Sequence, residues 1–150
     1  MSWKLPVFLF LAISSNVRPA SAAEPADAKP LAARVQHYDK VPADESPWGS
    51  LRWMMNGKIE PGAGVTLGVV ELKAGQSNPR HVHPNCEEVI YVLSGTCRHE
   101  VGKETVTLRP GDVLRIPAGV PHMATALGNE PSRSIVVYNT GERQFTPVPK

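Results

Sequence analysis

The chain has 150 residues, enough for one domain with a hydrophobic core and too few for two ordinary domains. Hydrophobic residues make up 41% and charged residues 20%, as in a globular protein, while 15 prolines and 12 glycines indicate frequent turns rather than long helices. The formal net charge is only +2, and Lys and Arg form no cluster with aromatic residues, so the sequence indicates neither a nucleic-acid partner nor an anionic membrane surface.

Residues 1–22 have the pattern of a secretory signal peptide. Lys4 precedes a short apolar run, Leu5 to Ile13, and small residues follow up to Ala22 and Ala23, after one of which we expect cleavage. This run is far shorter than the ~20 apolar residues that span a bilayer, which argues against a membrane anchor. Cleavage removes two of the 16 basic residues, so the mature chain has 14 basic and 14 acidic residues. We expect this mature protein to be periplasmic or secreted.

The rest of the chain divides into an arm and a β domain. Residues 23–47 are rich in Pro, Ala and charge, which predicts an extended N-terminal arm, and residues 48–150 would form the domain. In the domain, short runs with β character alternate with Gly, Pro, Asn or Asp, and no stretch has a sustained helical period. The expected strands are residues 50–55, 65–73, 87–93, 97–101, 105–108, 113–116, 122–126 and 134–138. Closely spaced strands without an internal repeat predict a single all-β sandwich or barrel.

The chain has two cysteines, Cys86 and Cys97. In an oxidising compartment a disulfide has to be considered. If Ser94-Gly95 is a hairpin turn, Val92 rather than Cys86 lies opposite Cys97, and the two sulfur atoms are several residues out of register. We therefore expect two buried free thiols.

Three of the five histidines and one glutamate are spaced as ligands of one metal ion. His81 and His83 are one residue apart, so on an extended chain their side chains leave the same face about 7 Å apart. Glu88 begins the next strand run, and His122 follows a turn stiffened by two prolines. The alternative is that these histidines are structural polar residues.

The residue types also indicate which metals fit. Three neutral imidazoles and one carboxylate suit one divalent transition metal, Fe, Mn, Zn, Ni, Co or Cu, and six-coordination would leave two positions for water, dioxygen or substrate. One carboxylate on a divalent ion leaves a net charge of +1, which favours an anionic oxygen ligand.

Around these residues the sequence resembles the cupin superfamily over about residues 62–140. Two family motifs occur in order and with the family's spacing, although Ala126 stands where the second motif normally has an Asn that is not a ligand. The resemblance implies a double-stranded β-helix, the cupin jelly-roll barrel, with the metal on His81, His83, Glu88 and His122. The matching residues are Gly75, His81, His83, Glu88 and Gly95 in the first motif, and Gly111, Pro117, Gly119 and His122 in the second.

His99 is the candidate catalytic residue. If Glu88 points inward, the period of two turns Cys86, Ile90 and Val92 inward as well, and pairing across the turn at Gly95 brings Cys97 and His99 to the same side. His99 would then be a partner of a ligand or a proton shuttle. The alternative is a histidine at the barrel rim, packed or in water.

Other residues near the expected site have weaker assignments. Glu87 would break the motif spacing and should face away from the metal. Arg115 has no partner that the sequence identifies. Residues that come from flanking strands and can line the pocket are Arg52, Trp53, Met54, Met55 and Tyr138, although core packing is the ordinary role of the Trp and Met residues.

The resemblance implies a metal-dependent enzyme of the dioxygenase, decarboxylase or isomerase kind. Because the fold does not decide among these, we favour a dioxygenase-like oxidoreductase on the ligand set, acting on a small, oxygen-rich and anionic molecule. The alternative is a secreted binding or sensing module without turnover, favoured by the lack of an obvious general acid or base beyond the ligands and His99. The resemblance also implies a homodimer, with the segment before Trp48 crossing to the partner.

Overall fold

The computed structural model describes residues 30–149. The expected signal peptide, residues 1–22, and the start of the arm lie outside these residues. The described elements are the 3-10 helices η1 (Leu31–Arg34) and η2 (Tyr38–Lys40) and the strands β1 (Asp44–Ser46), β2 (Gly49–Met55), β3 (Thr66–Leu72), β4 (His81–Val82), β5 (Glu88–Ser94), β6 (Thr96–Val101), β7 (Glu104–Leu108), β8 (Val113–Ile116), β9 (His122–Leu127), β10 (Ser132–Tyr138) and β11 (Thr146–Pro147). None of the helices in this part of the chain has the length and apolar character needed to cross a bilayer.

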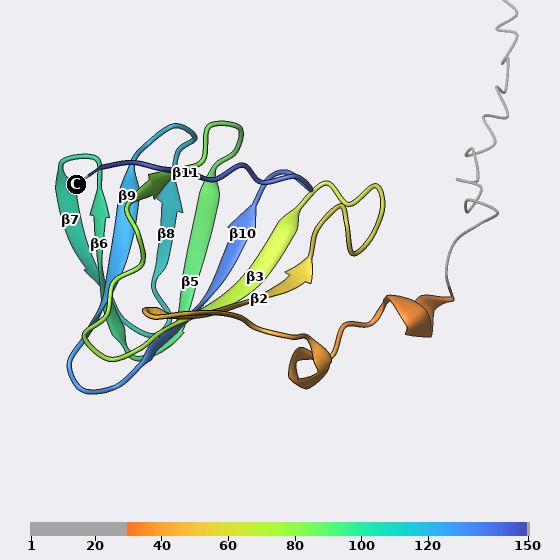
Figure 1. The fold of residues 1–150 in the computed structure, drawn as a ribbon, viewed down its shortest axis with the longest axis horizontal. Coiled ribbons are helices and arrows are strands. Elements are labelled where there is room, and N and C mark those ends of the chain that lie inside the picture. Colours follow the sequence, from red (N-terminus) through yellow and green to blue (C-terminus); the bar gives the residue numbers. More distant parts are fainter. Residues whose placement is uncertain (1–29, 150) are drawn as a thin grey trace, which may run out of the picture. The chain divides into compact units, whose positions relative to one another are not determined.

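The strands form two antiparallel sheets, as the all-β prediction requires. The first has six strands in the order β1-β2-β3-β10-β5-β8, and the second has five in the order β11-β4-β9-β6-β7. Some neighbours, such as β3 and β10 or β4 and β9, are distant in sequence, and the two sheets face each other in the ribbon view (Figure 1). This is the jelly-roll barrel that the motifs predicted, and the eight expected strands correspond to β2, β3 and β5 to β10.

Alternation along the strands directs side chains into the space between the sheets. In β10, Ser132, Ser134, Val136 and Tyr138 are buried while the residues between them are half-buried. The same period of two buries Glu88, Ile90 and Val92 of β5 and leaves Tyr91 and Leu93 exposed. Because successive side chains of a strand point to opposite faces, one face of each sheet forms the core. The inward direction expected for Glu88, Ile90 and Val92 is confirmed.

The expected hairpin at Ser94-Gly95 is wrong. β5 pairs with β10 and β8 in the first sheet, whereas β6 pairs with β7 and β9 in the second, so the chain changes sheet at Gly95. Gly95 has φ +71°, and its α-carbon lies against the carbonyl of Pro131. The tight crossing therefore requires glycine for a reason other than a two-residue turn.

Both cysteines are nevertheless free and buried, as expected. Burial raises the pKa of both thiols, which keeps them protonated at neutral pH. Cys86 lies just before β5 of the first sheet, and Cys97 lies in β6 of the second. Their separation follows from the sheet change and not from a hairpin register.

Part of the expected arm belongs to the fold. β1 lies within residues 23–47 and pairs with β2, so strand pairing begins at Asp44 and not near Trp48. The Tyr38 ring of η2 lies against two guanidinium groups, at 4.8 Å from Arg52 and 4.4 Å from Arg133. Arg52 also donates a hydrogen bond to the Tyr38 hydroxyl at 3.0 Å. These contacts attach the arm to the outer surface of the first sheet.

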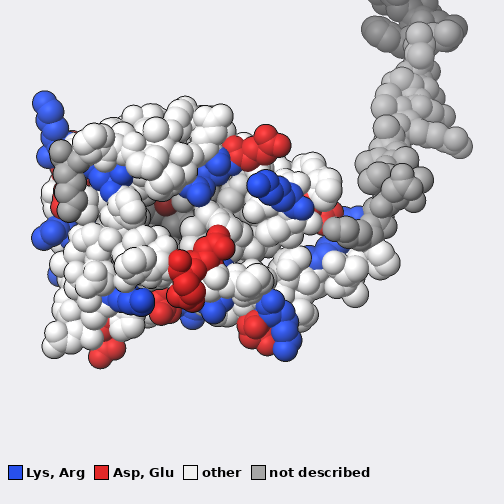
Figure 2. All heavy atoms as spheres, viewed as in Figure 1, with Lys and Arg blue, Asp and Glu red and all other residues white. Residues whose placement is uncertain are grey.

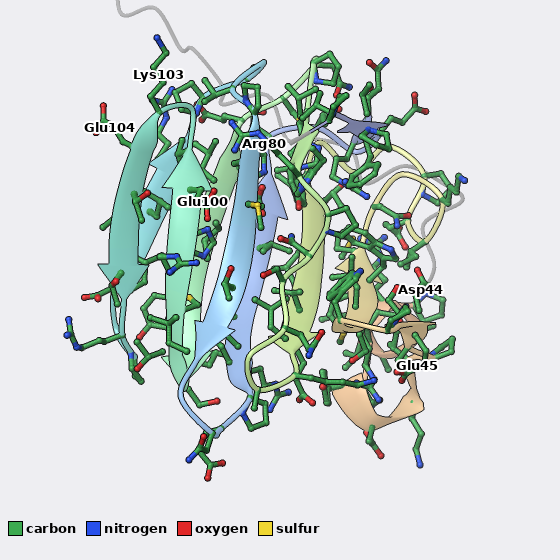
Figure 3. All side chains as sticks on the ribbon, turned by 60° about the vertical axis from the view of Figure 1, so that its left-hand side comes forward. Asp44, Glu45, Arg80, Glu100, Lys103 and Glu104 are labelled. Atoms are coloured by element: carbon green, nitrogen blue, oxygen red, sulfur yellow. The ribbon has the colours of Figure 1, made fainter. Side chains whose placement is uncertain are left out.

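The charged residues are spread over the surface. Acidic and basic side chains are interspersed on the face shown in Figure 2. Asp44 and Glu45 lie on β1 at one side of the domain, while Lys103 and Glu104 lie at the β6–β7 turn on the other side (Figure 3). Arg80 donates a hydrogen bond to the Gly102 carbonyl at 3.0 Å and so joins the segment before β4 to that turn.

Two motif glycines allow the sheet crossing to be tested with a matched pair. Gly95 and Gly75 have nearly equal φ, +71° and +70°, but an added Cβ would lie 2.2 Å from the Pro131 oxygen at Gly95 and would meet nothing within 4 Å at Gly75. We expect Gly95→Ala to lower the free energy of unfolding by about 1–3 kcal/mol more than Gly75→Ala, because only the first adds a clash to the backbone strain. Urea denaturation measures both values, and equal losses would contradict this account.

Candidate metal centre

The four expected ligands converge between the two sheets. His81 is in β4 and pairs directly with His122 in β9, His83 follows β4, and Glu88 begins β5 on the facing sheet. All four side chains are buried, and one ligand atom from each lies within 4.8 Å of the others. The β4 strand has only two residues, so the two histidines of the pair lie at its start and just beyond its end.

Backbone carbonyls fix the tautomer of each of these histidines. In all three rings Nδ1 lies 2.7–2.8 Å from a carbonyl oxygen, and a carbonyl can only accept a hydrogen bond. Each Nδ1 therefore carries the proton, and each Nε2 presents a lone pair to the centre. The carbonyls belong, in the order His81, His83 and His122, to Pro79, Gln144 and Val120.

The groups at the centre are all acceptors. Nε2 of His81 is 3.2 Å from Nε2 of His83, and Nε2 of His122 is 2.9 Å from Oε2 of Glu88. With the protons on Nδ1, no hydrogen lies between these atoms, so the buried lone pairs face one another. A divalent cation satisfies all four at once. In metal-bound histidines the ring nitrogen that does not bind the metal typically donates a hydrogen bond to a carbonyl or carboxylate, as Nδ1 does here. The cluster fits a site for one divalent transition metal ion, and Fe, Mn, Zn, Ni, Co and Cu all suit these ligands.

The environment keeps the ligands in the protonation states that metal binding needs. Burial, helped by the nearby His122, lowers the pKa of His81 to about 4, so its imidazole is neutral at pH 7. Burial by itself raises the pKa of Glu88, but the adjacent His122 and His83 rings outweigh burial and lower that pKa below its usual range. Glu88 is therefore a carboxylate. Affinity for a metal should fall as acid protonates the histidines.

Tyr138 holds the second oxygen of the Glu88 carboxylate. Its hydroxyl donates a hydrogen bond to Oε1 of Glu88 at 3.1 Å, while Oε2 of Glu88 faces the imidazoles. Burial and the charge of Glu88 raise the pKa of Tyr138, so the phenol stays protonated and remains a donor. Tyr138 thus orients the ligand.

A cavity of about 280 Å³ adjoins the cluster. His81, Glu88 and His122 line it, and so does Tyr138, as expected. Four other flanking residues predicted as possible lining do not line this cavity: Arg52, Trp53, Met54 and Met55. Trp53 instead lines a neighbouring surface hollow.

His99 lies in the same cavity and not at a solvated rim. The side chain is 5% exposed, and its position in β6 is directly opposite Ala124 of β9. Within residues 30–149, its Nδ1 is buried and has no hydrogen-bond partner. Burial lowers the pKa of His99 to about 4, so the ring is neutral at pH 7. His99 is near the cluster without being part of it, and its catalytic role stays a prediction.

The loop after β10 supplies residues that sequence reasoning missed. Phe145 stacks on the His81 ring with centroids 4.6 Å apart and an interplanar angle of 25°. The Arg143 side chain reaches the His83 ring, with Nη1 3.4 Å from Nδ1. Neither residue has a motif spacing, and β11 brings the loop to the site by pairing with β4. A sequence pattern could not have identified them.

Glu87 faces away from the centre, as expected. Its carboxylate accepts a hydrogen bond from Nε of Arg115 at 2.7 Å, on a neighbouring strand. This ion pair gives Arg115 the partner that the sequence did not identify, and it leaves Glu88 as the carboxylate at the cluster.

Removal of one ligand tests the centre. We expect the wild-type protein to bind one equivalent of a divalent transition metal and His83→Ala to lower the affinity at least tenfold, because an Nε2 ligand is lost. Mass spectrometry of metal content and competition with a chelator measure this. His37→Ala removes an exposed histidine of the arm and should leave metal binding unchanged. Equal metal content in both variants would contradict the assignment.

Tyr138→Phe tests the hydrogen bond that orients Glu88. Loss of an interaction that positions a ligand typically lowers metal affinity 10–100-fold, and we expect an effect of this size. The matched control is Tyr91→Phe, which removes a hydroxyl from an exposed position. Metal affinity measured by chelator competition should change only in the first variant, and an unchanged value there would show that the hydroxyl does not matter.

Comparison with known proteins agrees with the fold and with the resemblance to the cupin superfamily. The family model "Cupin domain" matches residues 68–138. The chain is 34% identical over 84 residues to "Germin-like protein subfamily 2 member 1" of Arabidopsis thaliana. The matched region covers 51% of this chain and 37% of that protein. The chain thus spans from about a third to half of the length of the curated germin-like relatives that it matches.

Solved structures share the barrel at low sequence identity. The oxalate decarboxylase of Lactobacillus farciminis, solved as a formate complex, has a TM-score of 0.70 at 23% identity, covering 75% of this chain and 35% of that one. An oxalate oxidase in complex with the substrate analogue glycolate has a TM-score of 0.68 at 21% identity, covering 80% of this chain and 68% of that one. These structures show the shared fold, and the family model together with both motifs shows that the chain belongs to the cupin superfamily.

Proposed function

We propose that this protein is a metal-dependent oxidoreductase of the dioxygenase kind that acts on a small organic molecule with anionic oxygen groups. The observation that carries the proposal is the set of three Nε2 lone pairs and one carboxylate that converge beside a cavity of about 280 Å³. Structural neighbours named as an oxalate oxidase and an oxalate decarboxylase support metal chemistry on a small acid. A bound divalent ion would polarise a substrate oxygen and, if redox-active, would accept or donate electrons.

Charge favours an anionic substrate. A divalent ion with the single carboxylate of Glu88 has a net charge of +1, and the guanidinium of Arg143 adds a second positive group beside His83. The side chains around the cluster keep bulk water from the ligands, since Phe145 covers His81 and Tyr138 lies edge-on to His83 at 4.9 Å between centroids. A buried site with few charges strengthens the attraction for an anion.

His99 is the candidate catalytic residue of this proposal. With a pKa of about 4, its ring is neutral at pH 7. A neutral imidazole donates a hydrogen bond from one nitrogen and accepts one at the other, and it carries no second proton. We assign it the role of a hydrogen-bonding group for bound substrate or dioxygen in the cavity that it lines.

Turnover is the direct test. We expect protein loaded with Fe or Mn to consume oxygen in the presence of small hydroxy or oxo acids, diketones or catechols, and His83→Ala to abolish this uptake. Oxygen-electrode measurements with each metal and substrate class provide the rates. Metal and ligand binding without uptake for any pair would leave the binding-module alternative in place of the enzyme.

The role of His99 has its own measurement. His99→Ala should lower kcat by ~10²-fold or more with unchanged metal content, the effect typical of a lost acid, base or hydrogen-bonding group. Since the folded pKa is about 4, the His99-dependent activity should be constant from pH 8 to pH 5 and fall only as the pH approaches 4. A change in activity near pH 6.5 that is present in the wild-type pH profile and absent in His99→Ala would contradict the lowered pKa of His99. His37→Ala serves as the control.

Export through residues 1–22 and a homodimeric state complete the proposal. Both rest on the sequence pattern and the family resemblance. Exposed apolar side chains of β5 and β8 are compatible with a second copy, with Tyr91 42% and Val113 61% exposed and directly opposite each other.

A further inference from the structure

The cavity beside the metal centre has two chemically different parts. One end is polar, where His81, Glu88 and His122 meet. The remaining wall is mainly aliphatic and comes from both sheets. Its apolar members include Leu51, Val70, Leu72, Ile90, Ala124 and Val136. A wall of this kind binds apolar groups, and the few polar groups fix the orientation of the ligand.

The volume exceeds what a very small acid needs. An apolar cavity of roughly 150 Å³ holds benzene, whereas this cavity measures about 280 Å³. If a metal ion and its waters take the space of three water molecules, ~90 Å³ at ~30 Å³ each, roughly 190 Å³ remains. A two-carbon acid would leave most of the aliphatic wall without a contact.

Arg143 marks the polar end as a site for a carboxylate. Its guanidinium lies over three rings, at 4.8 Å from Trp53, 5.2 Å from Tyr138 and 5.4 Å from Phe145. Such contacts hold the cation in place from its faces and leave its N–H groups, which lie in the guanidinium plane, for hydrogen bonds. Arg143 is half-buried and lines the cavity.

The hydrogen bonds of this guanidinium have no protein acceptor of matching charge. Within residues 30–149, no carboxylate forms a salt bridge with Arg143. Its Nη1 lies 3.4 Å from Nδ1 of His83, but that nitrogen donates a hydrogen bond to the Gln144 carbonyl at 2.7 Å and cannot accept one. A half-buried, ring-bound guanidinium without an anion is complementary to a carboxylate, which it can bind with two parallel hydrogen bonds.

We infer that the cavity binds a monocarboxylate with an apolar body about the size of an aromatic ring, its carboxylate on Arg143 beside the metal centre and its body against the aliphatic wall. The inference rests on the proposed function for the presence of a metal at the polar end. It deepens that function, because Arg143 and the wall then determine which acid is accepted. Arg143 is a substrate-binding residue in this arrangement, and a dicarboxylate without an apolar body is a poor fit.

Two probes that differ by one phenyl group test the apolar body. Isothermal titration of the full mature chain loaded with Zn, which is redox-inert, gives the Kd of phenylglyoxylate and of glyoxylate without turnover. We expect phenylglyoxylate to bind at least tenfold more tightly, because only its ring contacts the aliphatic wall. Ala124→Leu, which fills the cavity opposite His99, should remove this preference and leave the affinity for glyoxylate unchanged. Equal affinities in the wild-type protein would overturn the inference without any variant.

Charge variants test the carboxylate site. Arg143→Gln should weaken both probes at least tenfold and leave binding of benzyl alcohol, which has the ring without the charge, unchanged. Arg143→Lys should restore part of the loss, and the matched control Arg115→Gln, at a residue paired with Glu87, should have no effect. Unchanged affinities in Arg143→Gln would overturn the inference.

Failure of the metal assignment gives a different result. Zn content is measured in every sample, and the titrations are repeated after treatment with a chelator. If the wild-type protein binds no equivalent of Zn before the chelator is added, the proposed function is contradicted. The effect of Arg143→Gln on phenylglyoxylate binding in the chelated protein would still test the carboxylate site. The preference for phenylglyoxylate over glyoxylate should survive in Arg143→Gln, because the wall distinguishes the two probes and Arg143 binds the carboxylate that they share.

Discussion

The convergence of buried hydrogen-bond acceptors on one point is the constraint on which the rest of this structure depends. Three imidazoles with their protons on Nδ1 and one carboxylate face the same point, at separations of 2.9–3.4 Å between the neighbouring atoms of His81, His83, Glu88 and His122. Such an arrangement is unfavourable unless a cation is present, since buried acceptors without a donor lose their hydration. The tautomers, the carbonyl partners and the phenol of Tyr138 all serve to hold these lone pairs in place.

The two-sheet topology explains how residues so far apart in sequence meet. Glu88 comes from the six-stranded sheet, and the histidines come from the five-stranded sheet, where they lie in β9, in β4 and just after β4. Neither sheet alone has a complete set of ligands. The packing of the sheets therefore assembles the metal centre and the adjoining cavity together.

Sequence reasoning found the parts of this site that have a periodic or motif signal. The spacing of His81, His83 and Glu88 and the Pro-rich turn before His122 identified a ligand set that the structure brings together, and alternation identified the inward face of β5. The turn at Gly95 was misassigned, because a positive φ occurs both in a hairpin and where the chain changes sheet. Only the pairing of β6 with β9 distinguishes them, and pairing is a long-range property.

The missed elements are short or lack a pattern. β4 and β11 have two residues each, too few for alternation to be visible, and β1 lies in a segment whose composition resembles a linker. Arg143 and Phe145 reach the site only because β11 pairs with β4. Residues that reach a site through such long-range strand pairing can be identified from the structure and not from a sequence pattern.

The attachment of the chain's last segment to the metal centre has a thermodynamic consequence. The Gln144 carbonyl accepts a hydrogen bond from His83, Phe145 covers His81, and β11 pairs with the strand that contains His81. Order in the C-terminal segment and occupancy of the centre are therefore linked equilibria, and each must favour the other by the same free energy. A bound metal ion would therefore tighten the packing of this segment against the barrel, and loss of the ion would loosen it.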